Sequence, residues 1–202
     1  MTTHYTIDAL KREIIEIGRQ AMLHGYVTTV GGNISVRLNE REFLVTATGV
    51  PLDELNDENV ILIDQDGNTQ SRFKPSKEAP MHLLIYEARP EIQAVVHLHP
   101  IIATTLASLD IPITPVTFEQ VFFLGDEIGI VAPLSAGGED LHRAVLAEAI
   151  RCNTVILKHH GCVAVGTTLK EAYFRAVKIE RAAHATLIAR TFGKTIEPPV
   201  LL

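Results

Sequence analysis

The sequence predicts an α/β sandwich in which helices cover a mixed or antiparallel sheet. Short runs rich in Val, Ile and Leu, typical of strands, are interleaved with longer segments in which apolar residues recur at helical spacing. The chain has 202 residues, 47% of them hydrophobic, and contains no linker-like run of Gly, Ser or Pro. We therefore expect a single domain, residues 1–202, with a substantial core.

Helices are predicted from apolar periodicity and from residues that favour helix ends. The segments are 6–23, 77–89, 137–150 and 169–192. Thr6 begins the first segment and Thr168 precedes the last, and both are suitable N-caps. Gly25 and Gly193 are the expected stops of these two helices. In the second segment, Pro80 fits only the first turn of a helix, so Glu78 is expected at or beside a helix N-terminus.

Strands are predicted where short runs are rich in apolar β-formers or alternate between apolar and polar residues. These runs are ISVRL (34–38), FLVTA (43–47), VILID (60–64), 92–99, ITPVTF (113–118), the apolar part of 125–133, and the runs on either side of 159–161. In 92–99, period-two geometry places His97 and His99 on one face of the strand.

His97 and His99 are candidate metal ligands. A His-x-His pair on a strand can place two imidazole nitrogens about 2 Å from one metal ion. The ordinary alternative is one half-buried histidine that bonds a backbone carbonyl and one exposed histidine.

A second histidine cluster strengthens the metal hypothesis. His159-His160-Gly161 stands where one apolar strand ends and another begins, and a polar side chain at the end of a buried strand needs a partner. A third nitrogen from this cluster would complete a three-histidine set with an open position, as in catalytic zinc sites. Glu78 would then be a fourth ligand or an acid/base beside the metal.

Two turns are candidate anion sites. Gly31-Gly32-Asn33 precedes the run ISVRL, and Thr48-Gly49 follows FLVTA. Each is most simply a plain turn. A glycine-rich turn also lets the backbone approach a ligand closely and offer N–H groups to a phosphate, so both interpretations stay open on the turns alone.

Composition favours a cytoplasmic enzyme that acts on a small molecule. The net charge is −6, and neither a Lys/Arg cluster nor a basic helix face is present, which argues against nucleic acid or an anionic membrane as the partner. The sequence shows no signal-peptide pattern and no run of the about 20 apolar residues that a membrane helix needs. Cys152 and Cys162 lie in apolar sequence without CxxC spacing and are expected to be buried thiols.

Five motifs together resemble the class II aldolase superfamily, which includes L-fuculose-1-phosphate aldolases and L-ribulose-5-phosphate 4-epimerases. They are GGNISVR (31–37), TATGVP (46–51), SKE (76–78), VVHLHP (95–100) and HHG (159–161). The motifs occur in the order and at roughly the spacing of the superfamily, and the resemblance spans nearly the whole chain. It is specific for the superfamily and not for one member, and it implies a three-layer fold.

The resemblance also implies roles for individual residues. His97, His99 and His160 would bind one divalent metal per subunit, with zinc as the first choice and manganese or cobalt as alternatives. Glu78 matches the catalytic carboxylate, which is bound to the metal at rest and moves protons once substrate displaces it. The positions that match phosphate-binding residues are Asn33, Thr48, Gly49 and Ser76. His159 is interpreted as an outer partner of the site, and a homotetramer with active sites at subunit boundaries is implied.

The implied reaction is reversible aldol cleavage by a lyase. A metal with an open position can stabilise the ene-diolate that forms when a sugar phosphate splits into a dihydroxyacetone-phosphate-type ketone and an aldehyde. The alternative is decarboxylation of a 3-oxo sugar-acid phosphate, which passes through the same kind of intermediate. The segment KPSKEAPMH (74–82) is similar to the 3-oxo-tetronate 4-phosphate decarboxylase branch, because Lys77 stands where fuculose-phosphate aldolases have a second serine. Lys77 is then either a cation for phosphate or carboxylate, or a solvated residue at a helix end.

Two departures limit the resemblance. Fuculose-phosphate aldolases carry a tyrosine acid in the segment that matches 111–126 and another tyrosine near the C-terminus. The tyrosines of this chain are Tyr5, Tyr26, Tyr86 and Tyr173. The proton donor is therefore unassigned, and an epimerase, which needs an acid/base pair, is disfavoured. Adducin-type members, which are binding modules without metal, lack the three histidines that this chain has.

Overall fold

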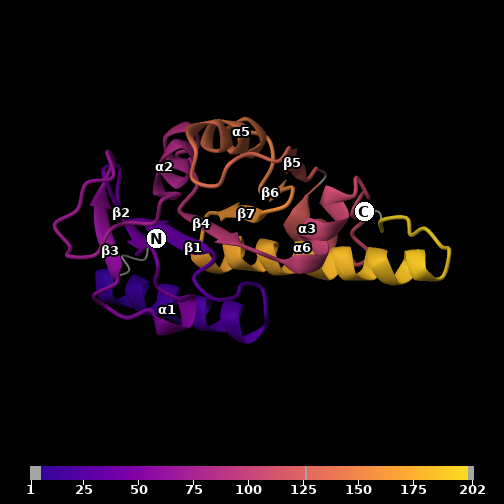
Figure 1. Ribbon diagram of the computed structural model, residues 1–202, viewed down its shortest axis with the longest axis horizontal. Coiled ribbons are helices and arrows are strands. Elements are labelled where there is room, and N and C mark those ends of the chain that lie inside the picture. The colour runs from indigo at the N-terminus through magenta and orange to yellow at the C-terminus, as the bar shows by residue number, and fades with distance from the viewer. Residues whose placement is uncertain (1–5, 126, 200–202) are drawn as a thin grey trace.

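A seven-stranded mixed sheet forms the middle layer of the computed structural model, which describes residues 6–125 and 127–199 (Figure 1). The strands are β1 (Asn33–Arg37), β2 (Glu42–Thr46), β3 (Val60–Asp64), β4 (Ala94–Leu98), β5 (Gly129–Val131), β6 (Thr154–Leu157) and β7 (Gly161–Gly166). Their order in the sheet is β3-β2-β1-β4-β7-β6-β5. Neighbouring strands are antiparallel except β5 and β6, which are parallel. The predicted α/β sandwich with a mixed sheet is confirmed.

Helices cover both faces of the sheet (Figure 1). They are α1 (Ile7–Leu23), α2 (Ala79–Ala88), α3 (Ile101–Ser108), α4 (Phe118–Leu124), α5 (Glu139–Ala149) and α6 (Leu169–Thr191), with a short 3₁₀ turn at Leu52–Glu54. One apolar layer lies between the sheet and α1, α3 and α6, and the other lies between the sheet and α2 and α5. The helix α4 packs against α6.

Alternation along β4 assigns its histidine to one layer. Val96 and Leu98 pack in the layer under α6, whereas Val95 packs in the layer under α2 and α5. Successive strand residues point to opposite faces, so His97 shares the face of Val95. This histidine therefore lies on the same side of the sheet as the N-terminus of α2.

The predicted helix starts are confirmed where the cap is local. The Thr6 side chain accepts a hydrogen bond from the backbone N–H of Ala9, and the Thr168 side chain accepts one from the N–H of Glu171. Glu78 occupies the N-cap position of α2, with Pro80 in the first turn. The carboxylate of Glu78 is thereby held at the end of a helix that faces the sheet.

The predicted strand at ITPVTF (113–118) is wrong. Residues 111–116 form no regular element of the described chain, and α4 begins directly after Thr117. The Thr117 hydroxyl accepts from the backbone N–H of Gln120 at 3.2 Å, and the Gln120 side chain accepts from the N–H of Val116 at 2.7 Å. These paired caps stabilise a helix where β-branched residues suggest a strand.

The sequence does not predict α3, because its cap comes from a distant part of the chain. The backbone N–H groups of Ile102 and Ala103 donate to the carboxylate of Glu180, at 3.0 and 2.7 Å. Glu180 lies on α6, so the carboxylate that satisfies the first turn of α3 is provided by tertiary packing.

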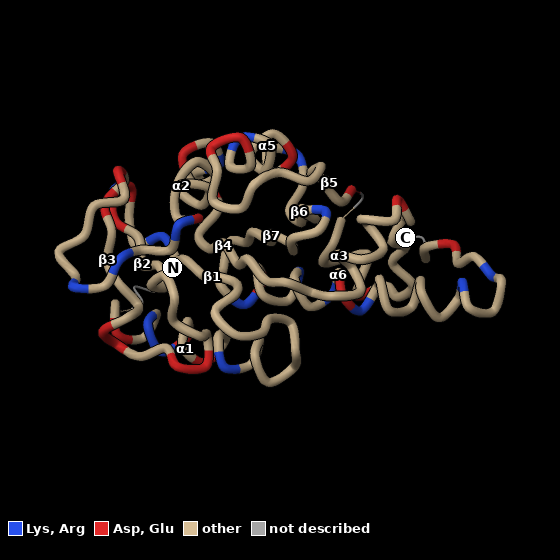
Figure 2. The backbone as a smooth tube through the Cα atoms, in the orientation of Figure 1, with Lys and Arg blue, Asp and Glu red and all other residues tan. Residues whose placement is uncertain are grey.

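The surface carries acidic and basic residues on the same elements (Figure 2). Examples are the pairs Arg19–Glu16 on α1 and Arg143–Glu139 on α5. Within residues 6–125 and 127–199, no helix has the length and apolar composition to span a membrane. Cys152 and Cys162 are buried free thiols, as expected.

Candidate metal centre and adjoining cavity

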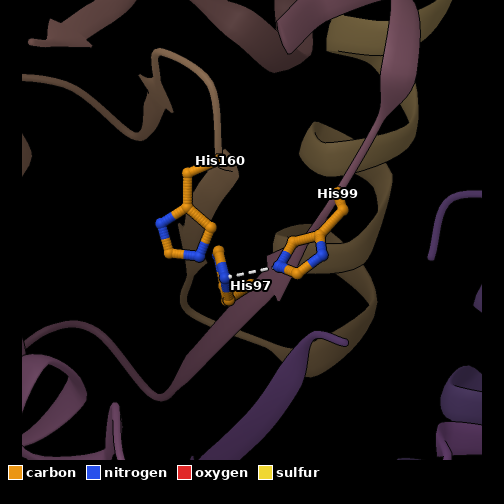
Figure 3. Close-up of side chains that lie close together, drawn as sticks. All are labelled: His97, His99 and His160. Atoms are coloured by element: carbon orange, nitrogen blue, oxygen red, sulfur yellow. Dashed lines mark hydrogen bonds between the residues drawn. The ribbon is translucent and has the colours of Figure 1, made fainter. Parts of the chain in front are cut away.

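Three histidines meet where β4 ends beside the connection of β6 and β7 (Figure 3). His97 lies within β4, opposite Asn33 of β1. His99 follows the strand, and its backbone N–H donates to the carbonyl of Tyr26 at 2.9 Å. His160 lies in the tight connection between β6 and β7. Strand pairing thus brings His97 and His160 together, although they are 63 positions apart in the sequence.

The imidazole nitrogens of these histidines face one another. One nitrogen from each ring lies within 4.8 Å of the other two, and Nε2 of His97 is 3.0 Å from Nε2 of His99 (Figure 3). Nδ1 of His97 is 2.9 Å from the carbonyl oxygen of Cys162. A carbonyl only accepts, so Nδ1 carries a hydrogen and donates it, while Nε2 points into the cluster. Outer hydrogen bonds of this kind orient metal-binding histidines.

Two glycines leave room for the rings. A Cβ on Gly31 would come within 2.7 Å of Nδ1 of His99, and a Cβ on Gly161 would come within 2.7 Å of Cδ2 of the same ring. Contacts this short force a neighbour to move. A larger residue at Gly31 would displace the imidazole, and one at Gly161 would meet the backbone carbonyl of Leu98 as well as the ring. The glycines of the GGN and HHG motifs therefore serve the histidine cluster directly.

Glu78 joins the cluster from the N-cap of α2. Its Oε2 is 3.2 Å from Nε2 of His97, and its Oε1 is 3.5 Å from Nε2 of His160. The Asn33 side-chain amide donates to Oε2 at 2.9 Å. Burial alone would raise the pKa of Glu78, but His97 and the Asn33 amide outweigh it and lower the pKa to about 2. The carboxylate is therefore ionised at neutral pH.

The donor set fits a divalent metal. Burial lowers the pKa of His99 to about 3 and also lowers the pKa of His160, so both rings are neutral near pH 7. Neutral rings offer lone pairs, and nitrogens that face each other beside an ionised carboxylate suit a shared cation. Three imidazoles with a further position open are a donor set of catalytic zinc sites.

A cavity of about 280 Å³ opens beside the histidines. The sequence-predicted residues that line it are Asn33, Thr48, Gly49, Ser76, Lys77, Glu78, His99 and His160. His97 lies next to this group with its side chain fully buried. The structure thus brings the predicted metal ligands, Glu78 and the predicted anion-binding residues to one place. They come from β1, the turn after β2, the start of α2, the end of β4 and the β6–β7 connection.

The backbone donors around the predicted anion site are only partly free. The N–H groups of Thr48 and Ser76 already donate to backbone carbonyls, at 3.0 and 3.1 Å. The N–H of Gly49 makes no hydrogen bond with another described residue, and its φ of +74° is readily adopted only by glycine. The cavity therefore offers an anion two hydroxyls, from Thr48 and Ser76, the Gly49 N–H and the ammonium of Lys77.

Asn33 connects Glu78 to the cavity. Its Nδ2 donates to the Glu78 carboxylate, which leaves Oδ1 buried and without a hydrogen-bond partner among the described residues. An amide oxygen accepts only, so Oδ1 suits a hydroxyl of a ligand better than a phosphate oxygen.

Some residues depart from the sequence-based interpretation. His159 is exposed, and its backbone N–H donates to Oγ of Ser108 at 2.8 Å. Among the described residues its side chain forms no hydrogen bond, so no contact supports a role as an outer partner. Ala136 and Gly137 line the cavity but are not singled out by the sequence. Their only signal is the run of small residues SAGG (135–138) in front of α5.

Comparison with known proteins identifies the family of this chain. The family described as class II aldolase and adducin N-terminal domain matches residues 12–187. The chain is 33% identical over 180 residues to the 3-oxo-tetronate 4-phosphate decarboxylase of Haemophilus influenzae, covering 87% of this chain and 85% of that protein. It is 34% identical over 178 residues to the L-fuculose phosphate aldolase of Methanocaldococcus jannaschii, covering 88% and 96%. A solved L-fuculose 1-phosphate aldolase has a TM-score of 0.86 at 26% identity, covering 99% of this chain and 93% of that one. The protein therefore belongs to the class II aldolase and adducin N-terminal domain family.

Proposed function

We propose that the protein is a metal-dependent lyase that reversibly cleaves a sugar phosphate to a dihydroxyacetone-phosphate-type ketone and an aldehyde. One observation supports this most directly. The ionised Glu78 and three facing imidazoles lie at a cavity that the donors of Thr48, Ser76 and Lys77 also line. A proton acceptor, a metal-type donor set and an anion site thus adjoin a single small cavity.

Each group has a role in this reaction. A divalent ion held by His97, His99 and His160 would supply Lewis acidity for the charge that develops on the substrate carbonyl oxygen. The Glu78 carboxylate moves the proton, and Asn33 holds this carboxylate through its amide. Contacts to the phosphate, remote from the bond that breaks, orient the reacting end.

The test is a screen of the zinc-loaded protein against phosphorylated ketoses and 3-oxo sugar-acid phosphates. Release of triose phosphate without carbon dioxide from at least one ketose phosphate is the expected result, with activity that disappears on chelation and returns with metal. A purified protein that binds no transition metal and cleaves none of these compounds would instead be a binding module of the adducin type.

Decarboxylation of a 3-oxo sugar-acid phosphate is the second candidate. It is favoured by the position of Lys77, which lines the cavity beside Ser76 and Glu78, where a cation could bind a phosphate or a carboxylate. The 33% identical relative from Haemophilus influenzae is named for this reaction.

Lys77→Ala separates the two candidates. If Lys77 contacts the phosphate, the variant raises KM for a phosphorylated substrate by about 10-fold to 100-fold, the effect of one hydrogen bond to a charged group, and leaves the unphosphorylated analogue unaffected. Lys74→Ala is the matched control, since Lys74 is exposed and outside the cavity. Equal effects on both substrates would place Lys77 at the reacting end and favour the decarboxylase. No effect on either would make Lys77 a solvated residue.

A further inference from the structure

Two buried histidines, one on α2 and one on α5, have no role in the proposed reaction. His82 stands one helical turn after Glu78 on α2, and His142 stands on α5, which packs beside α2 (Figure 1). The exposed fractions are 1% for His82 and 5% for His142. Both side chains are therefore enclosed in the layer between these helices and the sheet.

Hydrogen bonds fix the tautomer of His82. Oγ of Ser35 is 2.8 Å from the Tyr86 hydroxyl and 2.7 Å from Nδ1 of His82. The buried phenol must donate its hydrogen, and Ser35 is its side-chain partner among the described residues, so the phenol donates to Oγ. Ser35 then donates its own hydrogen to Nδ1. The neutral imidazole of His82 consequently carries its hydrogen on Nε2.

Three polar atoms on the contacting helices α2 and α5 are buried and have no hydrogen-bond partner in the described chain. They are Nε2 of His82, Nε2 of His142 and Oε1 of Glu78. Buried polar atoms are almost always satisfied by protein or by ordered water. Burial lowers the pKa of both histidines, and the negative charge of Glu78 opposes this lowering in each. This opposition is consistent with closeness of the three groups.

We propose that His82 and His142 hold one ordered water that also binds Oε1 of Glu78 and positions its carboxylate. The water accepts from Nε2–H of His82 and donates to Oε1 of Glu78 and to Nε2 of His142. Nδ1 of His142 is not among the buried unpartnered atoms, so it can carry the hydrogen of that ring. Three hydrogen bonds are the usual number for a buried water.

The two histidines are thus positioning residues for Glu78. Asn33 and His97 already contact Oε2, whereas Oε1 has only the more distant Nε2 of His160 at 3.5 Å. The water would bond Oε1, so the carboxylate would be fixed at both oxygens. The consequence for catalysis rests on the proposed function of Glu78, but the water site itself does not.

A pair of variants at His82 tests the positioning role. The amide of Gln reaches about as far as Nε2, and the amide of Asn about as far as Nδ1. His82→Gln should keep most of kcat. His82→Asn should lower kcat by about 10-fold to 100-fold, which is the usual effect of losing an outer partner. In both variants KM and metal content should stay unchanged. A purely structural role predicts the reverse order, because Asn keeps the bond to Ser35. If a substitution at His82 unfolds the protein, His142→Gln and His142→Asn give a second pair for the same comparison. The control is His184→Gln, because His184 is exposed on α6.

High-resolution diffraction of the zinc-loaded wild-type protein tests the site without substrate. The expected result is one water within hydrogen-bond distance of Nε2 of His82, Nε2 of His142 and Oε1 of Glu78. Direct pairing of these atoms, or density for no water between them, would overturn the proposal whatever reaction the protein catalyses. A water in place together with no lyase activity would leave this site standing and reject the proposed function alone.

Discussion

The three imidazoles differ in burial, and their substitution should have different structural costs. Loss of an outer hydrogen-bond partner of a metal ligand lowers metal affinity by about 10-fold to 100-fold, and loss of a ligand itself should lower it by more. We expect this larger loss in each of the variants His97→Ala, His99→Ala and His160→Ala. Only the side chain of His97 is completely buried and bonded to a backbone carbonyl, so His97→Ala should also lower the melting temperature most. Metal analysis and thermal unfolding of the three variants check this. Stoichiometric metal with full activity in any variant would remove that histidine from the site.

Glu78→Gln should separate proton transfer from metal binding. Glutamine keeps an acceptor for the Asn33 amide, which donates to Glu78 at 2.9 Å, but it cannot take up a proton. Turnover should fall by about 10²-fold to 10⁴-fold, the usual contribution of general acid–base catalysis, while metal content falls much less. A parallel fall of turnover and metal content would mean that Glu78 acts as a ligand only.

The residues of the site are predictable to different degrees. The motifs that carry His97, Glu78 and Thr48 are local, and the structure places them around one cavity as expected. His142 gives no signal, because its relation to Glu78 arises from the packing of α2 on α5. His82 lies one helical turn after Glu78, but nothing in its own sequence pattern separates it from an ordinary core residue. The tautomer of His82 depends on Ser35 in a strand, which no local pattern reveals.

The secondary-structure elements are also predictable to different degrees. The helices α1 and α6 carry their own threonine caps, and their predicted starts are confirmed. The first turn of α3 is capped by Glu180 from α6, so local sequence is not enough to define this helix. The strand predicted at 113–118 is wrong, although the start of α4 has a local signal. Thr117 and Gln120 have the spacing of a capping box, but the β-branched residues of this run suggest a strand.

The turn before β1 can be tested as an element that holds His99 in place. In Gly31→Ala the new Cβ would lie 2.7 Å from Nδ1 of His99, so the ring must shift, and metal affinity should fall by at least about 10-fold. Gly193→Ala is the control. Gly193 has φ +65°, and no atom lies within 4 Å of the position that its Cβ would take, so alanine there should cost about 1–2 kcal/mol of stability without changing metal affinity. Metal titration and chemical unfolding of both variants give the comparison, and unchanged affinity in Gly31→Ala would contradict the assigned role of this turn.

At the scale of the whole molecule, α4 and the start of α6 present an aromatic surface to solvent. Phe118, Phe122 and Phe174 are 63%, 73% and 42% exposed, and the ring of Phe123 contacts those of Phe122 and Phe174. Contiguous apolar surface of this kind often marks a protein–protein contact. The family resemblance implies a homotetramer with sites at subunit boundaries, and a neighbouring subunit could then supply the proton donor that segment 111–126 lacks.

We therefore expect a homo-oligomer, with a tetramer as the first choice, in sedimentation equilibrium of the wild-type protein. Phe122→Glu would place a charge in the aromatic surface, where burying it without a partner is unfavourable, so the oligomer should dissociate while the subunit stays folded. Phe192→Glu is the matched control, because Phe192 is 77% exposed at the far end of α6. If the subunit boundary completes the active site, Phe122→Glu should lose turnover together with its oligomeric state, and high protein concentration should restore both. A wild-type protein that sediments as an active monomer would contradict the oligomer and require a proton donor within the single chain.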